Sequence, residues 1–164
     1  MKNITKFFAI AVVILGFSAS SFAQVSATAT ATGTIVSALT IENIANMNFG
    51  NIIPGTEGGT VVLVPAGTRT ATGSVTLPAA AGTISAARFT VGGTVDAIYN
   101  ITLPSTYTIT NGTQSMTVST FTSDPISLGT LTNVGVGTIN VGATLTVASS
   151  QAGGVYTNTA GFPV

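Results

Sequence analysis

The stretch VSATATATGTIVSALTI, residues 25–41, alternates small apolar side chains with serine and threonine. Because side chains of a strand point alternately to its two faces, this period of two predicts β-structure. Seventeen extended residues would span about 55 Å at about 3.3 Å per residue, whereas a strand usually has five or six residues. We therefore expect two consecutive strands. The odd positions are Val25, Ala27, Ala29, Ala31, Gly33, Ile35, Ser37, Leu39 and Ile41.

Short apolar or alternating runs continue to the end of the chain and are separated by Gly-Gly, Asn-Gly, Pro-Gly and Leu-Pro steps, which favour turns. No helical pattern of useful length interrupts them. The fold class predicted is all-β, an immunoglobulin-like antiparallel β-sandwich. The further strands are expected at residues 59–64, 73–77, 88–91, 98–103, 116–121, 138–147 and 155–164.

The composition excludes most catalytic and nucleic-acid-binding functions. The 164 residues include 30 Thr and 19 Gly, but no Cys, His or Trp, and only four cationic and four acidic side chains. Without thiolates and imidazoles, the usual metal ligands and general bases are missing. Nucleic-acid binding requires several cations that neutralise phosphates, which this chain lacks. We therefore expect no enzyme activity, no cofactor, no metal and no nucleic-acid partner.

The first 23 residues have the pattern of an export signal. Lys2 and Lys6 precede a short apolar run at residues 7–17, and Ser21-Phe22-Ala23 has the small-x-small form that signal peptidase cuts before Gln24. The apolar run is too short to span a membrane, which takes about 20 residues. We expect three segments: a signal peptide at 1–23, an N-terminal extension at 24–37 and a β-sandwich domain at 38–164, with no membrane span in the mature chain.

A set of ordered blocks resembles the exported bacterial family described as domain of unknown function 4402. The blocks are Met47 to Gly55 followed by Gly59-Thr60-Val61, then Phe89 to Gly92, Tyr99 to Pro104, Met116-Thr117-Val118 with Phe121, Val141 to Val147, and Gln151 to Tyr156. The resemblance covers essentially the whole mature chain. That family usually continues into a longer closing strand, so we expect either a short final strand or a truncated sequence.

The family is similar in pattern to pilus subunits of the chaperone-usher type, whose sandwiches lack one strand and receive it from a neighbour's N-terminal extension. The resemblance implies a structural subunit of a surface filament on a Gram-negative cell, with neighbouring copies of itself as partners and a periplasmic chaperone and an outer-membrane usher for assembly. The donor strand would be residues 25–35. Its inward residues, which would form the subunit interface, are Val25, Ala27, Ala29, Ala31, Gly33 and Ile35.

Two alternatives stay open from the sequence. In the first, residues 25–35 form the first strand of their own sandwich by pairing within the chain, an ordinary arrangement that we favour less than donation to a neighbour. The protein would then be a secreted monomeric module that binds carbohydrate or protein, for which Tyr99, Tyr107 and Tyr156 are candidate platform residues.

The remaining polar motifs are weak. Asn100 and Asn111 match the Asn-x-Ser/Thr glycosylation sequon, although Asn111-Gly112 is also a typical hairpin turn. The carboxylates Glu42, Glu57, Asp96 and Asp124 are isolated in sequence, and we expect Asp96 and Asp124 to lie in turns.

Overall fold

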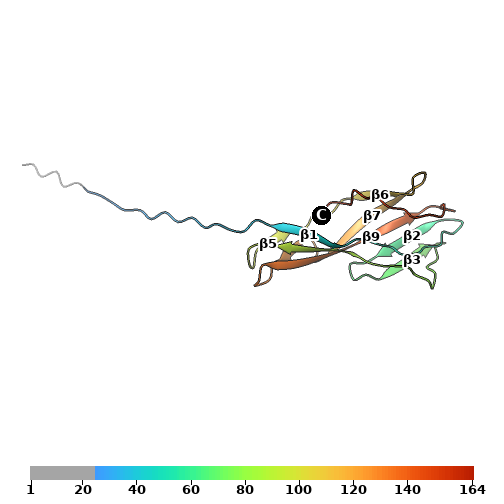
Figure 1. Cartoon of the computed structure of the whole chain (residues 1–164), viewed down its shortest axis with the longest axis horizontal. Helices are drawn as coiled ribbons and strands as arrows, with labels where there is room; N and C mark the ends of the chain where they lie inside the picture. The colour runs from blue at the N-terminus through green and yellow to red at the C-terminus, as the bar shows by residue number, and fades with distance from the viewer. Residues whose placement is uncertain (1–24) are drawn as a thin grey trace, which may run out of the picture. The chain divides into compact units, whose positions relative to one another are not determined.

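The computed structural model describes residues 25–164, which fall into two units divided between Thr34 and Ile35. The predicted signal peptide lies outside the described residues. Residues 25–39 form no strand, and their side chains are exposed. The second unit contains nine strands and, within the described residues, no helix, as Figure 1 shows. The strands are β1 (Thr40–Ala45), β2 (Gly59–Leu63), β3 (Arg69–Gly73), β4 (Ala87–Gly92), β5 (Ile98–Asn100), β6 (Thr106–Thr110), β7 (Ser115–Asp124), β8 (Leu128–Thr130) and β9 (Val136–Val147).

All the strand pairings are antiparallel, and β9 is the central strand. Its first half pairs with β4 and its second half with β2, while β7 pairs along the opposite edge. The sheet order is β1-β4-β9-β2-β3, with β6 attached through β7, and β5 and β8 form a separate pair. The predicted all-β antiparallel sandwich class is therefore confirmed.

Gly142 lies at the point of β9 where the pairing with β4 ends and the pairing with β2 begins. Val141 is opposite Ala87 of β4, whereas Ala143 is opposite Leu63 of β2. A Cβ at Gly142 would stand 2.2 Å from the carbonyl oxygen of Leu63. Only glycine therefore lets β2 and β4 approach the same strand in succession.

The core consists of two clusters that follow this division of β9. One joins Val61, Val118 and Leu145, which face one another across β2, β7 and β9. The other joins Phe89 and Ile139 across β4 and β9. Each pair of facing residues comes from strands that alternate buried and exposed positions, which is the pattern of sheets with one covered face.

Tyr99 belongs to the second cluster and does not meet Tyr107 or Tyr156. Its side chain is 6% exposed, and burial raises the pKa of its phenol. Tyr107 and Tyr156 pack instead against the first cluster. A platform formed by all three tyrosines, a candidate from the sequence, is therefore ruled out, because β5 turns Tyr99 inward.

Several expected strands differ from the observed ones. The strand expected at 73–77 is wrong: the hairpin partner of β2 is β3, which ends at Gly73. Residues 155–164 form no strand and pair only through a bridge between Thr157 and Thr110. Two consecutive strands were expected within residues 25–41, but only Thr40 and Ile41 are in a strand there, as the first residues of β1.

Candidate functional site

A groove of about 970 Å³ lies over the first core cluster. Its floor consists of apolar side chains from β6, β7 and β9, and its two walls are residues 46–52 and 151–159. Four floor residues are only 3% to 7% exposed, so the groove lies over a closely packed part of the core. The floor residues are Tyr107, Ile109, Met116, Val118, Leu145 and Val147.

The first wall is paired along one edge only. Asn48 and Ser85 exchange two backbone hydrogen bonds, of 2.8 and 3.0 Å. The amides of Met47 and Phe49, on either side of Asn48, take no part in this bridge. Within residues 25–164 these two amides donate to no acceptor. The wall therefore has two unpaired backbone donors among the residues that line the groove.

The second wall repeats this arrangement. Thr157 and Thr110 of β6 exchange two backbone hydrogen bonds, of 2.9 and 3.0 Å. The neighbouring amides of Tyr156 and Asn158 have no acceptor among the residues that the structure describes. The Asn158 side chain donates to the carbonyl of Thr108 at 2.9 Å, which ties the wall to β6. The groove thus lies between two strand-like segments that are each half paired.

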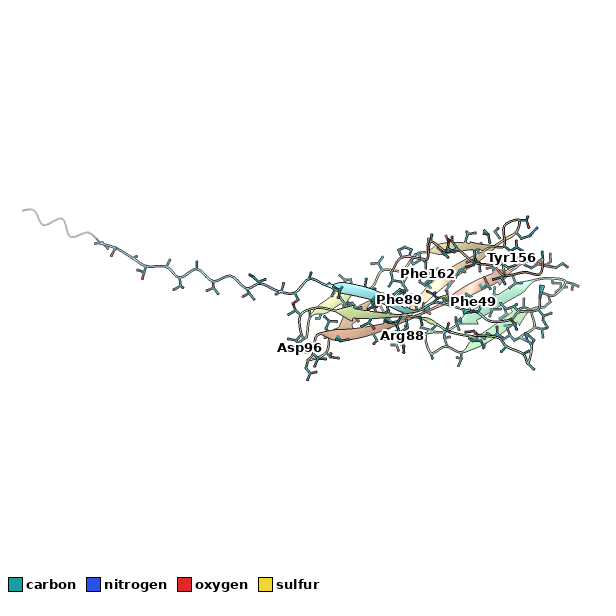
Figure 2. The ribbon with its side chains drawn as sticks, viewed as in Figure 1. Phe49, Arg88, Phe89, Asp96, Tyr156 and Phe162 are labelled. Atoms are coloured by element: carbon teal, nitrogen blue, oxygen red, sulfur yellow. The ribbon has the colours of Figure 1, made fainter. Side chains whose placement is uncertain are left out.

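Phe162 anchors the end of the second wall. Its ring lies 5.1 Å from the ring of Phe121, 5.9 Å from that of Tyr107 and 6.4 Å from that of Phe89, measured between centroids. The contacts with Phe89 and Tyr107 are edge-to-face, a favourable geometry for aromatic pairs. Figure 2 shows Phe162 between the positions of Phe89 and Tyr156. This aromatic contact connects the groove wall to the second core cluster.

Arg69 fastens the first wall from β3. Its guanidinium donates to the carbonyl of Phe49, to the carbonyl of Asn51 at 2.9 Å and to that of Ala81 at 3.4 Å. A planar fork with five donors suits three converging carbonyls, which an ammonium does not match. Sequence analysis missed this role, because nothing local to Arg69 indicates which carbonyls it meets.

Arg69→Lys is expected to lower the free energy of unfolding by about 1–3 kcal/mol, since hydrogen bonds to carbonyls are lost at a half-buried position. Urea denaturation of the two proteins measures the difference. Arg88→Lys is the matched control: Arg88 is exposed on β4, and its replacement should change stability by less than about 0.5 kcal/mol. Equal stability of both variants would contradict the fastening role of Arg69.

Of the residues singled out from the sequence, Tyr107 and Tyr156 line this groove. Val25 is 94% exposed and Ile35 is 99% exposed, and the donor residues between them are also exposed. Asn100 is exposed at the end of β5. Asn111 lies in the β6–β7 turn, where its Oδ1 accepts from the amide of Gln114 at 2.9 Å, so the hairpin interpretation of Asn111-Gly112 is confirmed.

The carboxylates are distributed over four separate places. Glu42 lies on β1, Asp124 ends β7, and Asp96 has a positive φ of 57° in the turn between β4 and β5. Glu57 follows the first groove wall, and its amide donates to Ser74 Oγ at 3.0 Å. Within residues 25–164 no three His, Cys, Asp or Glu side chains are grouped so as to hold a metal ion. Nor does that part of the chain contain a helix able to cross a bilayer.

These features define an antiparallel β-sandwich domain with an open, apolar-floored groove. The chain belongs to the family described as Domain of unknown function (DUF4402), whose model matches residues 39–164. The family assignment made from the sequence blocks is thereby confirmed. Comparison with curated proteins gave no match, and comparison with solved structures gave none either.

Proposed function

We propose that this protein is a structural subunit of an extracellular filament, in which residues 25–35 of one copy fill the groove of the next. The observation that carries the proposal is the pair of half-paired walls. A strand laid between them would accept hydrogen bonds from the free amides of Met47 and Phe49 on one side and of Tyr156 and Asn158 on the other. This is strand addition, a common mode of peptide recognition.

The side chains of the extension suit the apolar floor of the groove. The floor residues Met116, Val118, Leu145 and Val147 are apolar and nearly fully buried, so an inserted strand would meet an apolar surface. Ala27, Ala29, Ala31 and Gly33 occupy alternate positions of the extension, so a strand would turn its smallest residues toward the floor. Their threonine neighbours would face water.

The geometry of such a contact leads to a fibre. The extension and the groove are different surfaces of the same molecule, so the contact is heterologous. Heterologous contacts build open chains when the rotation between copies does not close a ring. Export through the predicted signal peptide would place the fibre at the cell surface, and assembly would involve a periplasmic chaperone and an outer-membrane usher.

The test uses the mature chain, residues 24–164, refolded from denaturant and imaged by negative-stain electron microscopy. We expect regular filaments, and we expect deletion of residues 24–35 to leave folded monomers with an unchanged circular dichroism spectrum. Stable monomers with the extension intact would overturn the proposal.

A monomeric binding module is the second candidate, and one observation favours it. Tyr107 and Tyr156 both line the groove, and aromatic rings beside polar backbone groups are typical of ligand sites. A groove of about 970 Å³ is also large enough for a small ligand. Monomers that retain the extension and bind an oligosaccharide or peptide in the groove would establish this alternative.

A further inference from the structure

Exposed aliphatic side chains gather at the end of the domain where β1 begins. Ser37 donates through its amide to Thr94 Oγ1 at 3.1 Å, and the amide of Gly93 donates to the carbonyl of Gly135 at 3.0 Å. These bonds bring together residues 36–39, 93–95 and 134–135, which we call the β1 pole. Figure 2 labels Asp96, which follows the pole segment 93–95.

The pole is apolar although it faces solvent. Val36 is 65% exposed, Leu39 56%, Val95 52% and Val134 73%. The Leu39 side chain also packs against Gly93, with its Cδ1 3.3 Å from where a Cβ would stand. Clustered exposed aliphatic residues on a soluble domain are typical of a contact surface.

The segment between the proposed donor strand and the domain is short, and its length limits how far the neighbouring subunit can lie from the pole. The proposed donor strand ends at Ile35, and Ser37 is already bonded to its own domain. Only Val36 lies between them, and two residue steps span at most about 7 Å. If a neighbour's groove holds residues 25–35, the end of that groove must lie within about 7 Å of Ser37. Because Ser37 is part of the pole, the neighbour's surface lies next to the pole.

We propose that the β1 pole is a second contact between subunits, which packs against the next copy around the mouth of its groove. This inference rests on the proposed function. Val36, Leu39, Val95 and Val134 are buried by that contact, so consecutive domains stack directly on one another. The filament is then stiff, because no free linker separates its subunits.

Thiol labelling tests the contact directly, because the chain has no cysteine. Val134→Cys gives one reactive site in the pole, and Ile126→Cys gives a matched site, 81% exposed and outside the pole. Both are made in the mature chain and in the same chain carrying Ala29→Asp and Ala31→Asp as a non-assembling reference. We expect maleimide labelling of Val134→Cys to be at least tenfold slower in filaments than in the reference, with Ile126→Cys unchanged.

Three outcomes are decisive. Filaments in which Val134→Cys is labelled as fast as in the reference would overturn the pole contact and leave strand donation intact. Absence of filaments from the unmodified mature chain would overturn the proposed function and this inference with it. Filaments of a Val95→Asp, Val134→Asp variant that bend sharply while the unmodified ones stay straight would support the contact, since donation is kept and stacking is lost.

Discussion

Aspartate at Ala29 or at Ala31 is expected to abolish filament formation while the domain still folds. Both alanines lie at inward positions of the proposed donor strand, and both are exposed in the single chain. Neither substitution therefore removes a contact within the domain. Electron microscopy and circular dichroism together measure the two parts of the expectation.

The expected loss of binding free energy between subunits follows from the cost of burying an unpaired charge. In the groove, the aspartate would face the apolar floor of Met116, Val118, Leu145 and Val147. The chain offers only two arginines beyond its signal segment, Arg69 and Arg88, and the guanidinium of Arg69 already donates to three carbonyls. An uncompensated buried charge costs about 3–5 kcal/mol. At about 1.4 kcal/mol per factor of ten, each subunit contact weakens by a factor of about a hundred or more.

Thr28→Asp and Thr30→Asp are the matched controls, with the same charge placed one residue away. Their side chains would point to the opposite face of the donor strand and stay in water. We expect both to form filaments. If all four variants assemble equally well, the alternating residues of the extension do not enter a groove.

Gly142→Ala is expected to cost at least about 3 kcal/mol of unfolding free energy, at the upper end of what overpacking usually costs. The new Cβ would stand 2.2 Å from the Leu63 carbonyl oxygen and 2.7 Å from the carbonyl carbon of Val64. Both neighbours are backbone atoms, so no side chain can rotate away. At a domain of this size, such a loss lowers the melting temperature by about 6–12 °C.

The control is Gly153→Ala, because a Cβ there meets nothing within 4 Å. We expect its melting temperature to stay within about 2 °C of that of the unmodified chain. Calorimetry of the three proteins gives the comparison. A Gly142→Ala protein as stable as the control would mean that β2 does not approach β9 as closely as its register requires.

The strands that sequence analysis located correctly are those with bulky residues at alternate positions. β2, β4, β5, β7 and β9 all overlap the predicted ranges, and each contributes buried side chains to a core cluster. β6 and β8 were not predicted. β6 alternates threonine with Tyr107 and Ile109 and so carries the period of two, but it follows Pro104 closely and buries neither larger side chain fully; β8 has only three residues, too few to show a period.

Pairing is harder to predict than strand position. Residues 73–77 have a suitable local pattern, but the turn after β2 sets the hairpin register and ends β3 at Gly73. The groove walls pair through single bridges, Asn48 with Ser85 and Thr157 with Thr110, so no continuous ladder marks them in the sequence. The family blocks at residues 47–55 and 151–156 overlap both walls, yet nothing in them indicates that a groove lies between.

The pairing of β1 with β4 has a mechanical consequence for a filament under tension. Pulling force would enter each domain at Ser37 and pass to the next copy through the groove wall that starts at Asn46. Between these points lies only β1, which is held to β4 through five registered pairs. The part of a pull that passes through this wall and runs along β1 loads these pairs in shear, all at once. The edge strand of the sheet would then act as the tensile member of the fibre, and the rest of the domain as its support.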